Sequence, residues 1–162
     1  MRTDVTLILL AVATVLTGLL AGISLDKCVV QLPARHRIGI RDFAAFIRAN
    51  DLGNGLVLYP VLGVGAAIVT FAAALIANSP RLTGTVAWAV DGSAVLAVLH
   101  LAVTTRAAPN ILLFRRSLPD DATIAAAFDR FAAWHGARTI LQVLNFLTLL
   151  WGAIAYASRV IR

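Results

Sequence analysis

The sequence contains no glutamate and only one cysteine, and each shortage excludes a class of protein. Without glutamate, the chain cannot contain the Glu-x-x-His motifs that hold metal pairs in di-iron helical bundles. Cys28 alone cannot form an intramolecular disulfide or a CxxC redox pair, which excludes thiol-relay chemistry within one chain. The chain also lacks a GxGxxG or P-loop pattern, so a nucleotide cofactor has no visible binding motif.

Long apolar runs are what the sequence has in abundance. Hydrophobic residues make up 60% of the chain and the mean hydropathy is +0.86, whereas soluble domains are roughly 45–50% apolar. Four runs without Lys or Arg approach the roughly 20 residues that a membrane-spanning helix needs. They are residues 5–25, 56–77, 86–105 and 139–157. Because these runs lack the alternation of barrel strands, the sequence predicts an all-α integral membrane four-helix bundle, with residues 1–162 forming one domain.

The basic residues are distributed unevenly among the predicted loops. Ten of the 14 Lys and Arg residues lie in or beside the two long loops, 26–55 and 106–136, and the other four lie on the opposite side. The positive-inside rule therefore predicts cytoplasmic long loops and external termini, and we expect a bacterial plasma membrane. The basic residues behind the net charge of +6 are explained by their position in cytoplasmic loops. The expected partner is therefore the lipid bilayer and not nucleic acid. The orientation also assumes that the first run is retained and not cleaved as a signal peptide, which its length favours.

Both long loops contain a helical pattern of apolar residues. In the first loop the apolar stripe consists of Ile40, Phe43, Ala44 and Ile47. In the second loop it consists of Ile124, Phe128 and Phe131, after a start signal at Pro119 and Asp120. These patterns predict two short amphipathic helices that lie at the membrane surface, with Gly136 bending the second one into the fourth span. The connection 78–85 reads instead as a tight turn.

A stripe of polar side chains lies at the beginning of the fourth run. His135, Arg138, Gln142 and Asn145 recur at spacings of three, four and three, which places them on one face of a helix. Such a face must contact protein or water and not lipid. The stripe serves either hydrogen bonding between helices or a polar pocket, in which Arg138 holds an anionic or phenolate oxygen while a histidine moves protons. We favour the pocket, because four polar side chains exceed what packing requires.

Further polar candidates lie on the side of the bundle that carries the long loops. They are Asp51 and Asn54 before the second run, Tyr59 within it, His100 and Thr104 on one face of the third run, and Asn110 beyond it. Functional and structural roles are balanced for His100, and caps or turns explain most of the others. Asp51 is expected to pair with Arg138 or with a ligand. We expect no metal and no cofactor, although His100 and His135 offer a weak alternative as ligands of one haem.

Three segments of the chain resemble the anthrone-oxygenase-like family of small four-helix membrane proteins. They are NDLGNGLVLYPVLG at 50–63, HLAVTTRAAPN at 100–110 and FDRFAAWHGARTILQVLNF at 128–146. The similarity covers nearly the whole chain and consists of helix ends and polar positions. Much of this family is a domain of unknown function, and its fungal members are associated with cofactor-independent oxidation of anthrones to anthraquinones. The resemblance therefore implies oxidation of a lipophilic phenolic or polyketide-like substrate.

The resemblance also implies roles for individual residues. The base is His100 or His135, the oxyanion donors are Arg138 and Asn110, the aromatic walls are Trp134 and Tyr59, and Thr104, Gln142, Asn145, Asp51 and Asn54 complete the pocket. The competing hypothesis is a non-catalytic scaffold or lipophilic-ligand-binding subunit, for which a homo-oligomer is one arrangement. In that case Gly18, Gly22, Gly63 and Gly65 allow the helices to approach closely.

Overall fold

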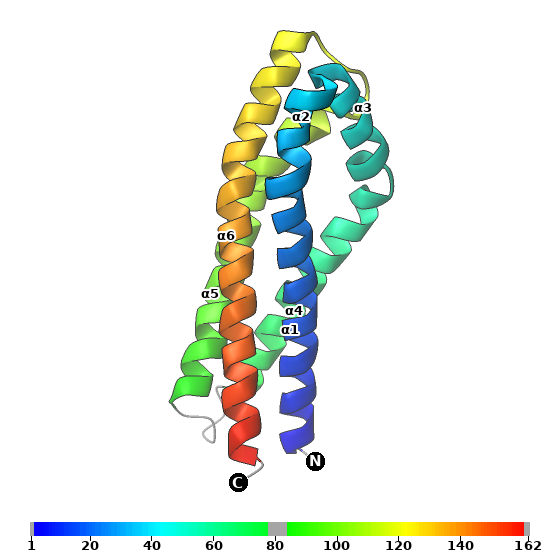
Figure 1. Cartoon of the computed structure of the whole chain (residues 1–162). Coiled ribbons are helices and arrows are strands. Elements are labelled where there is room, and N and C mark those ends of the chain that lie inside the picture. Colours follow the sequence, from blue (N-terminus) through cyan, green and yellow to red (C-terminus); the bar gives the residue numbers. More distant parts are fainter. Residues whose placement is uncertain (1, 78–83, 161–162) are drawn as a thin grey trace.

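The structure is a computed structural model that describes residues 2–77 and 84–160, and its ordered elements are helices throughout. In chain order they are α1 (Arg2–Asp26), η1 (Lys27–Gln31), α2 (Leu32–Ile38), α3 (Ile40–Ala49), η2 (Asn50–Asn54), α4 (Gly55–Ala77), α5 (Thr85–Leu112), η3 (Leu113–Arg115) and α6 (Asp121–Val160). Figure 1 shows α1, α4, α5 and α6 side by side, with both chain termini at one end. We call the opposite end, which carries α2, α3 and the start of α6, the capped end. The predicted all-α four-helix architecture is confirmed.

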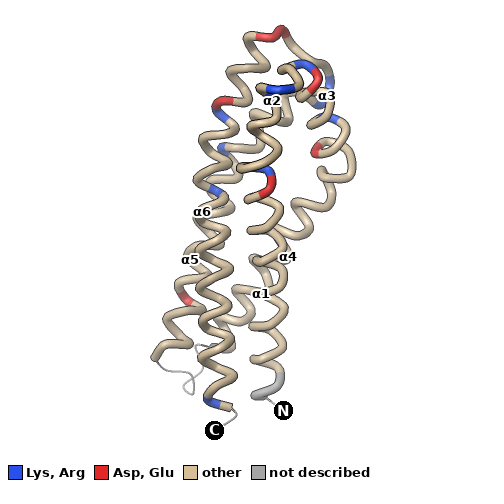
Figure 2. The backbone as a smooth tube through the Cα atoms, in the orientation of Figure 1, with Lys and Arg blue, Asp and Glu red and all other residues tan. Residues whose placement is uncertain are grey.

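The outer faces of the four long helices are apolar. One large side chain from each helix illustrates this exposure: Val15 is 60% exposed, Ile68 61%, Val95 59% and Ile140 63%. Four helical stretches, 5–38, 40–76, 85–115 and 121–160, are long and apolar enough to cross a membrane. A contiguous apolar surface of this extent is unusual for a soluble monomer and is compatible with an integral membrane protein. Figure 2 shows that the charged residues gather toward the capped end.

The helices are longer than the apolar runs that predict them. Helical backbone continues beyond α1 through η1 and α2, and stops only at Gly39, where φ is +91°. Helix α5 continues through Pro109, although a proline inside a helix removes a backbone hydrogen bond and disfavours helical structure. Helix α6 passes unbroken through Gly136, where a bend is expected, so the predicted second surface helix is the first part of α6. The predicted turn at 78–85 lies mostly outside the described residues.

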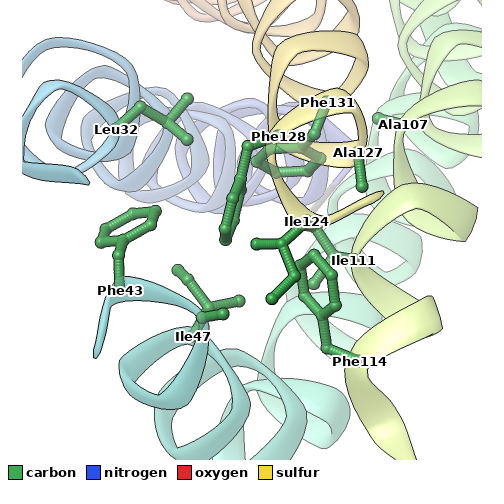
Figure 3. Close-up of a cluster of buried hydrophobic side chains, with 11 residues drawn as sticks. Leu32, Phe43, Ile47, Ala107, Ile111, Phe114, Ile124, Ala127, Phe128 and Phe131 are labelled. Atoms are coloured by element: carbon green, nitrogen blue, oxygen red, sulfur yellow. The ribbon is translucent and has the colours of Figure 1, made fainter. Parts of the chain in front are cut away.

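The capped end is closed by a cluster of large apolar side chains from α2, α3, α5, η3 and α6. This Phe-rich cluster consists of Leu32, Phe43, Ala44, Ile47, Ala107, Ile111, Phe114, Ile124, Ala127, Phe128 and Phe131. In Figure 3 the ring of Phe128 lies between those of Phe43 and Phe114, with centroids 5.0 Å and 5.1 Å away. The predicted apolar stripes of both loops thus pack on one another. That α3 also lies at a membrane surface stays a prediction.

The half of the bundle near the termini is packed through small residues. A Cβ atom added to Gly152 on α6 would lie 3.1 Å from the Cβ of Ala89 on α5, so these helices approach closely. On α1, a Cβ at Gly18 would lie 3.0 Å from the ring of Phe146. Of the four glycines that the scaffold hypothesis uses, only Gly18 has such a tight neighbour, and Gly152 was not among them.

Candidate functional site

The first part of the site is a buried ion pair between the π-helical turn η1 and the segment η2, which is kinked at Gly53. The turn η1 places Lys27 inside the protein, and η2 does the same for Asp51. The ammonium group of Lys27 donates a hydrogen bond to Oδ2 of Asp51, and both side chains are almost fully buried. An isolated buried charge is costly, so each group requires the other. Asp51 therefore forms its ion pair with Lys27 and not with Arg138, and its contact with a ligand stays a prediction.

Tyr59 on α4 lies next to this ion pair. The ammonium nitrogen of Lys27 is 5.5 Å from the centroid of the Tyr59 ring, within the range of a cation–π contact. The ring takes this position because residue 55 is glycine: a Cβ there would lie 2.7 Å from Cε2 of Tyr59. The glycine at the start of α4 thus brings an aromatic ring to the charged pair.

A chain of hydrogen bonds joins three helices below the ion pair. The hydroxyl of Ser24 on α1 donates to Oε1 of Gln142 on α6, and Nε2 of Gln142 donates to Nε2 of His100 on α5, at 2.8 Å. Since an amide nitrogen only donates, Nε2 of His100 is the acceptor, which places the proton of the neutral ring on Nδ1. All three side chains are buried. The sequence indicates His100 and Gln142, but Ser24 carries no signal within an apolar run.

His135 has a different environment from His100. Its side chain is 0% exposed and its ring stacks on Phe131, with centroids 5.1 Å apart. Nε2 of His135 donates to the backbone carbonyl of Ser24 at 3.3 Å, which fixes α6 against α1. His135 does not line the large cavity described below. In the structure this histidine connects two helices.

Arg138 lines the interior of the protein without a hydrogen-bond or ion-pair partner among the described residues. The Nε of its guanidinium is buried without an acceptor. Because Lys27 and Asp51 compensate each other, the charge of Arg138 is the excess charge at this place. Buried polar groups are normally satisfied, so the unpaired guanidinium needs an explanation.

These groups line a cavity of about 270 Å³ between α1, α4, α5 and α6, toward the capped end. Its polar lining consists of Ser24, Lys27, Asp51, Tyr59, His100, Thr104, Arg138 and Gln142. The rest is largely apolar, including Leu20, Leu56, Val64 and Leu101. The hydroxyl of Thr104 donates to the carbonyl of His100 at 2.8 Å. The cavity thus combines one excess positive charge with apolar walls.

Four other sequence candidates do not line this cavity. Trp134 is 42% exposed and Asn54 is also exposed, whereas the amide of Asn110 bonds to the carbonyl of Arg106 and accepts from Arg130. Asn145 lines a neighbouring pocket of about 10 Å³ together with His100 and Gln142. That volume suits about one water molecule. Six of the expected site residues are therefore brought together on the wall of the large cavity: Asp51, Tyr59, His100, Thr104, Arg138 and Gln142.

The two histidines do not present their Nε2 atoms to a common ligand. Nε2 of His100 accepts from Gln142, and Nε2 of His135 bonds to the carbonyl of Ser24. Among the residues that the structure describes, no three His, Cys or Asp side chains are grouped as a metal site would require.

Comparison of the chain with protein-family models, curated proteins and solved structures gives no match.

Proposed function

We propose that this protein is an integral membrane protein that binds a lipophilic molecule with an acidic oxygen in the cavity between α1, α4, α5 and α6. The observation that carries the proposal is the unpaired guanidinium of Arg138 on an otherwise largely apolar wall. By the distribution of basic residues, the capped end lies on the cytoplasmic side of a bacterial plasma membrane.

The charge balance of the cavity selects the ligand's polar group. A phenolate, enolate or carboxylate would satisfy the guanidinium by charge-assisted hydrogen bonds, which are stronger than neutral ones. A neutral ligand would leave the charge uncompensated, and a cation would be repelled. The apolar walls exclude a small hydrophilic anion, because it would lose its hydration without gaining apolar contacts. An amphipathic acid fits both parts of the cavity.

Cofactor-independent oxidation is the reaction that the sequence resemblance adds to this binding site. An anthrone would lose a proton from its methylene carbon, and the resulting enolate would react with O₂. One oxygen atom becomes the new carbonyl of the anthraquinone and the other leaves as water, so one O₂ is consumed for each molecule oxidised. Arg138 would stabilise the enolate oxygen, His100 would take the proton, and Tyr59 would contact the planar rings.

One observation favours a binding protein without catalysis. The basic lone pair of His100 is occupied, because its Nε2 accepts a hydrogen bond from Gln142. Catalysis requires that this bond break, whereas binding at Arg138 does not. The non-catalytic alternative is therefore a lipophilic-ligand-binding subunit that uses the same cavity.

Oxygen consumption by purified protein distinguishes the two roles. A hydroxylated anthrone is the substrate, spontaneous oxidation is subtracted, and Arg138→Met is compared with Arg130→Met, which removes an exposed arginine of the same helix. Uptake by the wild type and by Arg130→Met, lost in Arg138→Met, would support an oxygenase. No uptake, with Arg138-dependent binding of a hydroxyanthraquinone, would support the binding subunit. If the protein shows neither oxygen uptake nor Arg138-dependent binding, both the oxygenase and the binding subunit are contradicted.

A further inference from the structure

The cavity reaches the protein surface between α4 and α5. Of its lining residues, the exposed ones are Pro60 and Val64 on α4 and Leu112 on α5. The lining residues from α1 and α6 are buried or half-buried. Helices α4 and α5 are also in less extensive contact than α5 and α6. The opening therefore lies on one side of the bundle, between these two helices.

The rim of this opening is apolar. Leu56, Pro60 and Val64 recur every fourth residue and form one row on α4, opposite Leu101 and Leu112 on α5. Helix α4 contains no charged residue along its whole length. A rim without charges faces the hydrocarbon region if the four long helices span a bilayer.

The path from the capped end is closed by protein. Ile111 and Phe131 belong both to the cavity wall and to the Phe-rich cluster, so this cluster lies between the cavity and the capped end. The buried pair of Lys27 and Asp51 joins η1 to η2 at the same level. A ligand that entered from the capped end would have to disrupt both the Phe-rich cluster and the ion pair.

We propose that the ligand is a single-headed lipophilic acid dissolved in the bilayer, which passes sideways between α4 and α5 into the cavity. This inference rests on the proposed function. The acidic group moves inward to Arg138, and the apolar body stays against the α4 and α5 rows, where part of it remains in contact with lipid. The shared chemistry fits a lipophilic phenol or a fatty acid.

Two valine variants on α4 test this path. Val64 is 50% exposed and lines the opening, whereas Val61 is 63% exposed and does not line the cavity. The full chain is placed in lipid nanodiscs as wild type, Val64→Trp, Val61→Trp and Arg138→Met. Stopped-flow absorbance follows binding and release of 2-hydroxyanthraquinone, and competition with oleate measures affinity for a fatty acid. Unsubstituted anthraquinone serves as the neutral control ligand.

A blocked passage slows movement in both directions. We expect Val64→Trp to lower the rates of binding and release by about 10- to 100-fold with little change in the dissociation constant, because the ligand must displace a bulky ring. Val61→Trp should behave as the wild type. Arg138→Met should weaken binding of the acidic ligand by about 10- to 100-fold but leave anthraquinone unaffected.

The outcomes separate the path from the function. Equal rates in the two valine variants, or weaker binding by Val64→Trp with unchanged association, would overturn passage between α4 and α5 while Arg138-dependent binding stands. If the wild type binds neither acid, or if Arg138→Met binds both acids as tightly as the wild type does, the proposed function is wrong. The proposed entry path then has no ligand to carry and is overturned with it. Oleate binding tighter than 2-hydroxyanthraquinone, or the reverse, would identify which lipophilic acid the cavity prefers.

Discussion

The four long helices, α1, α4, α5 and α6, are arranged differently in the two halves of the bundle. Near the chain termini, α5 and α6 approach closely where Gly152 faces Ala89, whereas toward the capped end the four helices enclose a cavity of about 270 Å³. The first half has a buried apolar cluster in which alanines such as Ala13 and Ala73 pack with larger side chains such as Leu10 and Leu149. The second half contains the π-helical turn η1, a kink at Gly53 in η2 and Pro60 within α4. Figure 1 shows α4 leaning away from α6 toward the capped end.

This difference separates the source of stability from the place of function. Close packing in the half near the termini supplies dispersion contacts, which stabilise helix pairs where lipid offers no hydrophobic driving force. In the other half, the protein keeps open space and an unsatisfied cation, both of which cost stability. Such costs are typical of ligand sites, and π-helical turns occur frequently at functional sites. The two halves should therefore respond differently to substitution.

The largest effect is expected from breaking the buried ion pair. Asp51→Asn leaves the ammonium of Lys27 without its carboxylate, beside the uncompensated charge of Arg138. We expect a loss of about 3–5 kcal/mol, because removing one partner strands a buried charge. Thermal unfolding in detergent, followed by circular dichroism, measures the loss.

The double variant Lys27→Met with Asp51→Asn is the control for this prediction. It removes the stranded charge, so it should recover most of the lost stability. A double variant no more stable than Asp51→Asn would show that the carboxylate acts through something other than the pair.

Overpacking the other half is expected to have the next largest effect. Gly152→Leu places a side chain where only 3.1 Å separates a new Cβ from Ala89, and we expect a loss of about 1–3 kcal/mol. Gly136→Leu is the matched control on α6, because no atom lies within 4 Å of its added Cβ. The same unfolding measurement should show Gly136→Leu near wild type. Equal losses in both variants would remove the distinction between the two halves.

Removing the unpaired cation of Arg138 should increase the stability of the protein, whereas the two preceding substitutions decrease it. Arg138→Met eliminates a buried Nε without an acceptor, and leaving such a group unsatisfied costs about 1–3 kcal/mol. We expect Arg138→Met to raise stability by about 1 kcal/mol while it weakens binding of acidic ligands by about 10- to 100-fold. Arg130→Met, which loses an exposed hydrogen bond to Asn110, should give neither result. A destabilised Arg138→Met would mean that the guanidinium supports the fold.

Apolar periodicity predicts much of this fold and less of the site. The stripes around Phe43 and Phe128 are buried where their spacing places them, because an apolar face must be covered. Pro109 does not end α5, since the extensive packing of α5 on α6 outweighs local propensity. Tertiary contacts of this kind have no local sequence pattern.

The site residues show the same limit. Arg138 and Gln142 share a helix face, so their presence on one wall follows from spacing. Lys27 was counted as a loop charge, because a π-helical turn that carries a lysine inward has no recognised sequence pattern. His135 lies on the same stripe as Arg138, but the carbonyl of Ser24 occupies its ring nitrogen. Which polar residues face a cavity depends on neighbouring helices.

The smallest effect is expected at the capped end, outside the four helical stretches that are long and apolar enough to cross a membrane. Oδ1 of Asp120 accepts from the backbone N–H of Thr123 at 3.0 Å and Oδ2 accepts from its hydroxyl at 2.7 Å, which caps α6. These hydrogen bonds lower the pKa of Asp120, so the cap contributes stability above the ordinary carboxyl pKa and loses it as the pH falls through the lowered value. Asp120→Asn keeps an acceptor oxygen but cannot titrate. We therefore expect equal unfolding temperatures at neutral pH and a slightly smaller acid-induced decrease in Asp120→Asn. Identical pH profiles would show that the cap does not couple to unfolding, and that stability in this half depends on the Phe-rich cluster and the ion pair.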